Sequence, residues 1–272
     1  MILRLLFKHF KTEWAVLAPF GVFCFVYPFA LFLLSFDLMP FGMEWMSSLL
    51  LVMLGLTAGA WMRLNFGVRG IVLSVAIACL GLALEYLGVN TGFPFGRYSY
   101  TGVLAPGLPG GVPLAIAFAW LLIIVSGLFT ARAILGRLTR RIAPARMPLL
   151  VVLTGALLAV GLDLLLEPVA FRVKGYWLWA GANSGYYGVP LANFAAWFAA
   201  ALLLNWLVAV FLPKRETSHP RWLWVPSALY GMNVLLFGAV NLAHGFWLAA
   251  LTGLVILVAL YFTLFRRKPF GR

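Results

Sequence analysis

Three carboxylates, Glu85, Asp163 and Glu167, lie in or at the edge of stretches that are otherwise apolar. A charged side chain at the centre of a bilayer costs about 2.5–3.5 kcal/mol on insertion scales. The chain has only seven acidic residues, so three of them at membrane depth indicate a site. Burial among apolar and aromatic groups favours the neutral form of a carboxyl group, which can then act as a general acid near neutral pH.

The spacing of these residues suggests how they meet. Asp163 and Glu167 are four residues apart and share one face of a helix, which Pro168 ends or bends. Tyr186, Tyr187 and Asn193 fall at a similar depth. A purely structural interpretation is also open, in which the acids are ion-pair partners of Arg97, Arg172 or Lys174.

The elements that must position these residues are transmembrane helices. The 272-residue chain is 64% hydrophobic, with a mean hydropathy of +1.02. We predict an all-α polytopic bundle that forms one integral membrane domain over residues 1–272. About eight spans are expected: Trp14–Phe36, Trp45–Met62, Ile71–Val89, Val112–Leu135, Met147–Leu166, Val189–Leu212, Trp222–Leu242 and Phe246–Phe265.

The net charge is +13, but the basic residues are distributed along the chain as expected for a membrane protein and do not indicate nucleic-acid binding. With both termini placed in the cytoplasm, all Lys and Arg residues except Arg97, Arg172 and Lys174 fall on cytoplasmic segments. This pattern predicts a multi-pass protein of the cell membrane whose basic loops touch anionic lipid headgroups.

An internal repeat is predicted over residues 71–135 and 147–212. Gly111-Val-Pro-Leu-Ala115 recurs as Gly188-Val-Pro-Leu-Ala192, and a tryptophan, Trp120 or Trp197, stands nine positions after each glycine. Glu85 precedes its glycine by 26 residues and Asp163 precedes its glycine by 25. Parallel repeats bring equivalent positions face to face, so we expect Glu85 and Asp163 to approach one cavity from opposite sides.

The two repeat tryptophans could wall a groove for an extended apolar ligand or shield a cation through their ring faces, although core packing also explains them. No GxGxxG motif, P-loop or Cys/His metal spacing occurs, and three histidines are too few for a membrane di-iron enzyme. We therefore expect neither a metal nor any other cofactor.

Several of these residues carry a family resemblance. The stretch from Glu85 through Thr91-Gly-Phe-Pro-Phe-Gly-Arg-Tyr-Ser-Tyr100, the two Gly-Val-Pro-Leu motifs, and the segment from Asp163 to Pro168 resemble the CruF-like family of carotenoid 1,2-hydratases. The resemblance covers roughly residues 45–265.

The resemblance implies addition of water across the terminal C1–C2 double bond of an acyclic carotenoid ψ-end, as in lycopene or γ-carotene. Protonation at C2 gives a tertiary cation at C1, which water captures. It implies a long apolar carotenoid substrate, and we count other carotenoid-pathway enzymes among the expected partners. By physical argument, Asp163 donates the proton, with Glu85 opposite it as the alternative donor. The residues expected to hold the water and take its proton are Glu167, Tyr98, Tyr187 and Asn193, with Glu167 counted among the catalytic residues. Arg97, Tyr100 and Tyr186 are further expected binding residues, and Trp120 and Trp197 are expected beside the cation.

Two other functions stay open from the residues alone. Asp163-Leu-Leu-Leu-Glu167 is similar to the DxxxD motif of UbiA-like prenyltransferases, but those enzymes bind Mg²⁺ through two acidic clusters and no second cluster is present. Intramembrane acids and a parallel repeat also fit a proton-coupled transporter. Against transport, the polar residues stop near one leaflet.

Overall fold

The protein is a bundle of long apolar helices. The computed structural model describes residues 2–138, 147–181, 185–212 and 222–265. The helices are α1 (Ile2–Ser35), α2 (Trp45–Thr91), α3 (Ala115–Leu138), α4 (Met147–Pro168), α5 (Leu191–Phe211), α6 (Val225–Ala243) and α7 (Trp247–Leu260). One π-helical turn (Val169–Val173) extends α4, and another (Tyr261–Phe265) extends α7.

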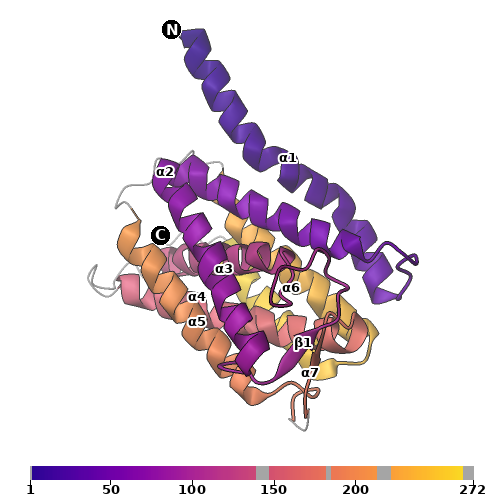
Figure 1. Ribbon diagram of the computed structural model, residues 1–272. Coiled ribbons are helices and arrows are strands. Elements are labelled where there is room, and N and C mark those ends of the chain that lie inside the picture. Colours follow the sequence, from indigo (N-terminus) through magenta and orange to yellow (C-terminus); the bar gives the residue numbers. More distant parts are fainter. Residues whose placement is uncertain (1, 139–146, 182–184, 213–221, 266–272) are drawn as a thin grey trace.

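Helix α2 contains two of the predicted spans. Its 47 residues would measure about 70 Å as a straight helix, more than twice the roughly 30 Å of bilayer hydrocarbon. The backbone at Gly67 is not helical (φ 59°, ψ −136°), and Figure 1 shows α2 as two rods joined by a sharp bend. A Cβ on Gly70 would lie 2.1 Å from the Met62 carbonyl oxygen, so glycine lets the rods approach closely.

In the described part of the chain, seven helices are long and apolar enough to cross a membrane. The bend in α2 reconciles this number with the eight predicted spans, because each of its halves has the length of one span. The prediction of an all-α polytopic bundle is confirmed.

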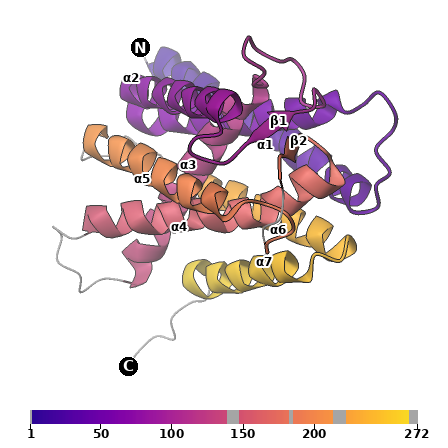
Figure 2. The same ribbon diagram turned by 60° about the horizontal axis from the view of Figure 1, so that its bottom comes forward.

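Helix α3 occupies the centre of the bundle. Within its most apolar stretch 67% of the residues are buried, against 22% in α7. Helix α3 contacts α2, α4 and α6, and in the view of Figure 2 the α2 and α7 helices lie on opposite sides of the layer that α4 and α5 form. Large side chains such as Trp61, Trp120 and Tyr230 are fully buried in this core.

The outer surface is apolar. Phe25 and Phe29 on α1, Val72 on α2 and Leu254 on α7 are all more than half exposed. Soluble monomers rarely expose such large continuous apolar areas, and together with the helix lengths this surface identifies a membrane protein.

A short sheet departs from the all-helical expectation. Strand β1 (Tyr98–Tyr100) follows α2, strand β2 (Trp177–Trp179) follows α4, and the two pair antiparallel. Tyr98 lies opposite Trp179, and Tyr100 opposite Trp177. The sheet therefore ties the α2–α3 connection to the α4–α5 connection at one end of the bundle.

Candidate active site

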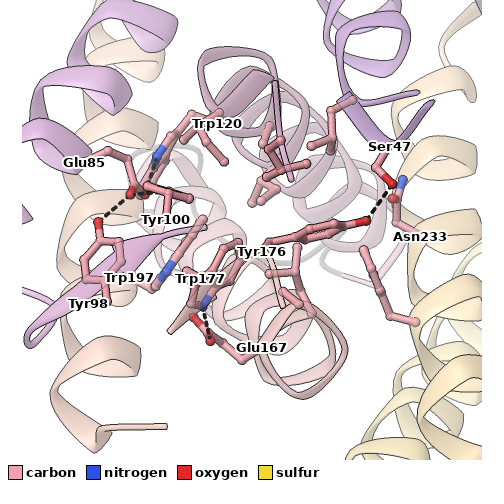
Figure 3. A pocket seen from close by; sticks show the side chains of 18 of the residues that line it. Ser47, Glu85, Tyr98, Tyr100, Trp120, Glu167, Tyr176, Trp177, Trp197 and Asn233 are labelled. Atoms are coloured by element: carbon pink, nitrogen blue, oxygen red, sulfur yellow. Dashed lines mark hydrogen bonds between the residues drawn. The ribbon is translucent and has the colours of Figure 1, made fainter. Parts of the chain in front are cut away.

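An internal cavity opens among α1, α2, α3, α4, α5 and α6, beneath the two-stranded sheet. Its free internal volume is about 100 Å³, which gives room for a few water molecules or the tip of a longer ligand. Most of the wall is leucine, isoleucine and aromatic side chains, and the acidic residues that line it are Glu85 and Glu167. Figure 3 shows these two carboxylates on separate walls.

Glu85 is held by three neutral donors. Tyr98 and Tyr100 donate their hydroxyls to Oε2 at 2.6 and 2.8 Å, and Trp120 donates its indole N–H to Oε1 at 3.1 Å. Alternate residues of a strand point to one face, so the Tyr-Ser-Tyr sequence of β1 aims both hydroxyls at the same carboxylate. Glu85 is thereby fixed at the cavity wall.

Glu167 is held in a similar way from the other half of the chain. Trp177 and Trp179 of β2 donate to Oε2 at 3.1 and 3.0 Å, and the Asn193 amide donates to Oε1 at 3.0 Å. By its contacts, Glu167 is the counterpart of Glu85, because each acid accepts two hydrogen bonds from the strand that follows its own helix. The spacing of the repeat had paired Glu85 with Asp163 instead.

Asp163 lies behind this wall. It is 1% exposed, and its Oδ2 accepts a hydrogen bond of 3.0 Å from the same Asn193 amide. Its Oδ1 has no hydrogen-bond partner among the described residues. Asp163 does not line the cavity, so Asn193 stands between the acid favoured as proton donor and the space where a substrate would sit.

The repeat tryptophans meet in the cavity wall. The rings of Trp120 and Trp197 stack with centroids 4.2 Å apart and planes 9° from parallel. Both side chains line the cavity. Both rings therefore lie where they can flank a reacting group in the cavity, and the Trp120 indole also donates a hydrogen bond to Glu85.

The tyrosines of β1 remain hydrogen-bond donors over a wide pH range. Burial, followed by the charge of Glu85, raises the pKa of both Tyr98 and Tyr100 above the usual value for tyrosine. Burial also raises the pKa of Tyr176 to about 12. Neutral hydroxyls therefore face the cavity.

In the part of the chain that the structure describes, no cation is hydrogen-bonded to any of the three acids. Within the described ranges, every hydrogen-bond partner of Glu85, Asp163 and Glu167 is a neutral tyrosine, tryptophan or asparagine. Arg172 donates to the Tyr187 carbonyl and lies over the Phe171 ring. The ion-pair interpretation of the acids is therefore wrong for the described structure.

The cavity gathers most of the predicted site residues but not all. Those that line it are Glu85, Tyr98, Tyr100, Trp120, Glu167, Asn193 and Trp197. Arg97 is exposed on an outer groove. Tyr186 donates to the Leu164 carbonyl, and the Tyr187 hydroxyl accepts from the Leu248 N–H. These three side chains do not line the cavity.

Several cavity residues were not predicted. Trp177 and Trp179 bind Glu167, and on the far wall Tyr176 donates to the Ser47 hydroxyl at 2.7 Å beside Asn233. The alternation in Tyr-Ser-Tyr and Trp-Leu-Trp was an available signal for two strands. Among the described residues, no group of three His, Cys, Asp or Glu side chains is arranged to hold a metal ion.

Comparisons with known proteins identify one matching family and one similar protein. A family model described as carotenoid biosynthesis protein matches residues 45–260. A bisanhydrobacterioruberin hydratase from Haloarcula japonica is 32% identical over 189 residues. That match covers 66% of this chain and 60% of the relative, so the chain spans less than two thirds of the relative's length. No solved structure matches the chain.

Proposed function

Because the chain belongs to the family of carotenoid biosynthesis proteins, we propose that it is a carotenoid hydratase. The reaction adds water across the terminal C1–C2 double bond of an acyclic ψ-end, as in lycopene or γ-carotene, and uses no cofactor. The observation that carries the proposal is a pair of carboxyl groups, Glu85 and Glu167, in the wall of an otherwise apolar and aromatic cavity inside a membrane bundle. The similarity to a protein named as a hydratase supports the same reaction class.

The chemistry needs an acid, a shielded cation and a positioned water. A carboxylic acid of the cavity transfers its proton to C2, which leaves a tertiary cation at C1. Water adds to C1, and a carboxylate takes the proton that this water loses. General acid–base catalysis of this kind contributes about 10²–10⁴ in rate.

The stacked indoles of Trp120 and Trp197 suit the cation step. A tryptophan face attracts a positive charge by about 0.5–2 kcal/mol, with the larger values at desolvated sites. An aromatic wall also delays the arrival of bulk water. The tertiary cation would therefore form beside Trp120 and Trp197, within reach of both carboxyl groups.

The apolar remainder of the cavity suits a long polyene. Leu50 and Leu51 of α2 and Leu236 and Phe237 of α6 line the cavity. A substrate that stays largely in lipid would enter through these apolar side chains and present its tip to the acids. Association with other carotenoid-pathway enzymes is a further expectation of this proposal.

The same proposal includes a topology and a duplication. If α2 crosses the membrane twice, the number of crossings is even and both termini lie on the cytoplasmic side, as the basic residues favour. The basic segments 139–146, 213–221 and 266–272 lie outside the described residues. The matching contacts of Glu85 and Glu167, and the stacked repeat tryptophans, support duplication of residues 71–135 and 147–212.

The test is expression in a lycopene-accumulating bacterium, with product analysis by liquid chromatography and mass spectrometry. We expect products heavier than lycopene by the mass of one water per hydrated end. In water enriched in ¹⁸O the new hydroxyl should carry the label, and in ¹⁸O₂ it should not. Unchanged lycopene in cells that contain the folded protein would contradict the proposal.

A further inference from the structure

The two acid sites of the cavity differ in what lies behind them. Each carboxylate accepts two hydrogen bonds from its own strand, but only Glu167 has a second acid next to it. The repeat motif places Ile116 where its second copy has Asn193, and this asparagine bridges Glu167 and Asp163. The difference bears on which acid carries a proton when the substrate arrives.

The surroundings of Glu85 suit a carboxylate. Hydroxyl bonds to an ionised oxygen are short, at about 2.5–2.7 Å, and the Tyr98 bond measures 2.6 Å. With Tyr100 and the Trp120 indole, three neutral donors face the two oxygens of one acid. Hydrogen bonds to the charged form of a group favour that form.

The surroundings of Glu167 suit a shared proton. Asp163 and Glu167 accept from the same Asn193 nitrogen at 3.0 Å each, and no described cation contacts either acid. Two carboxylates that share a buried site without a cation retain a proton between them.

On the premise of the proposed hydration, we infer that Glu167 donates the proton and Glu85 accepts one. The O–H bond of Glu167 breaks as a C–H bond forms at C2, and C1 becomes a cation. The oxygen of water then bonds to C1 while one of its protons passes to Glu85. Asp163 is a positioning residue, since it acts through Asn193 and does not line the cavity.

This division also places charge where the cation needs it. Once Glu167 has given up its proton, its carboxylate faces the cavity side on which the positive charge forms, and Asp163 lies behind it. Fixed groups that oppose a developing charge in a water-poor site stabilise the transition state. The cycle closes when a proton moves from Glu85 back to Glu167 through water in the cavity.

Deuterium exchange separates the two roles. The purified full chain is incubated with lycopene in D₂O, and both the hydrated product and the recovered lycopene are analysed by mass spectrometry. In Glu85→Gln the donor is intact, so C2 receives a deuteron. Because the cation is not captured efficiently, it reverts to lycopene by loss of one hydrogen from C2 to Glu167. Rotation about the C1–C2 and C2–C3 bonds lets the original hydrogen leave in place of the deuteron, so the recovered lycopene gains deuterium. Hydration should fall about 100-fold or more.

In Glu167→Gln both hydration and deuterium uptake should be lost, because no proton is delivered to C2. Asp163→Asn should reduce deuterium uptake and hydration together, and Glu44→Gln, outside the cavity at the start of α2, should match the wild type. Gel filtration in detergent is the check that each variant is folded.

Three results would overturn the inference: uptake lost in Glu85→Gln, uptake retained in Glu167→Gln, or Asp163→Asn matching the wild type. A wild-type protein that neither hydrates lycopene nor exchanges deuterium would instead contradict the proposed function on which the inference rests.

Discussion

The indole rings of Trp120 and Trp197 lie 4.2 Å apart and within 9° of parallel. The two residues come from different helices, α3 and α5, and occupy the same position after the repeated Gly-Val-Pro-Leu motif. Trp120 also donates to Glu85. The stack therefore joins the two halves of the chain at the point where one acid meets the cavity.

Replacing Trp197 tests the role of the stack without touching the hydrogen bond of Trp120. We expect Trp197→Leu to lower the hydration rate about 2- to 30-fold, which corresponds to the roughly 0.5–2 kcal/mol of a cation–π contact. Trp197→Phe should retain part of the rate because a ring face remains. The measurement is the initial rate with lycopene in proteoliposomes.

Trp206 provides the matched control, since it lies on the same helix and is 56% exposed. Trp206→Leu should leave the rate unchanged. Equal losses in the Trp197 and Trp206 variants would assign the effect to helix α5 and not to the ring at the cavity.

The hydroxyls of Tyr98 and Tyr100 on β1 should support stability and activity because they donate hydrogen bonds to Glu85. Tyr98→Phe and Tyr100→Phe each remove one of the two hydrogen bonds to Oε2, at a cost of about 1.5–3 kcal/mol in stability, the value for a hydrogen bond to a charged group. Both variants should also slow hydration, because the carboxylate form of Glu85 is less stabilised. Thermal unfolding in detergent and the hydration rate are the two measurements.

Tyr86→Phe removes a hydroxyl from a half-exposed tyrosine next to Glu85 in the sequence. It should change neither quantity. A Tyr98→Phe protein with wild-type rate and stability would show that its short bond to Glu85 contributes nothing.

The sequence predicts those features of the fold and the site that depend on local patterns, and it misses those that depend on contacts between distant segments. The spans followed from hydropathy, and Glu85, Trp120, Asn193 and Trp197 followed from an acid, a repeated motif and a tryptophan at fixed spacing. These are local patterns, and the helices that carry them place the residues in the cavity.

The parts that were missed depend on contacts between distant segments. Trp177 and Trp179 reach Glu167 only because β2 pairs with β1, and no local pattern states that pairing. Tyr187 was expected at the site, but its backbone adopts a positive φ of 54° and its hydroxyl meets the N–H of Leu248 at the start of α7. The single bend in α2 depends on Gly67, one glycine among 27.

Asn193 should couple two acids energetically. Asn193→Leu leaves Asp163 and the Oε1 atom of Glu167 without their shared donor, so we expect a loss of about 2–6 kcal/mol in stability, the sum for two buried unsatisfied acceptors. Adding Asp163→Leu removes one of these acceptors, and the double variant should be more stable than Asn193→Leu alone. Thermal unfolding of the four proteins in the cycle gives the coupling.

An additive result in that cycle would mean that the amide does not link the two carboxyl groups. Asn205→Leu is a suitable comparison, because Asn205 is equally buried on the same helix and donates to the Val152 carbonyl and not to an acid.

The bend in α2 should depend on Gly67. Its backbone angles (φ 59°, ψ −136°) lie in a region that is essentially restricted to glycine, and a side chain there costs on the order of 1–3 kcal/mol. Gly67→Ala should therefore lower the unfolding temperature. Gly21→Ala on α1, where a Cβ meets no atom within 4 Å, should be neutral or slightly stabilising; equal effects at both positions would argue against a bend at Gly67.

The pairing of β1 with β2 can be tested by a cross-link on its outer face. Ser99 lies opposite Leu178, and both side chains are exposed on the face away from the cavity. In a background with Cys24 and Cys79 replaced by serine, Ser99→Cys with Leu178→Cys should form a disulfide, because directly opposed strand residues have Cα atoms about 4.5–5.5 Å apart. A mobility shift on non-reducing gels reports the bond, and hydration should persist because Glu85 and Glu167 keep their donors. A peptide tag shows whether the protein is intact. If the two cysteines of the intact protein stay reduced in the presence of an oxidant, the two strands are not neighbours, and the sheet does not hold the donors of Glu85 and Glu167 together.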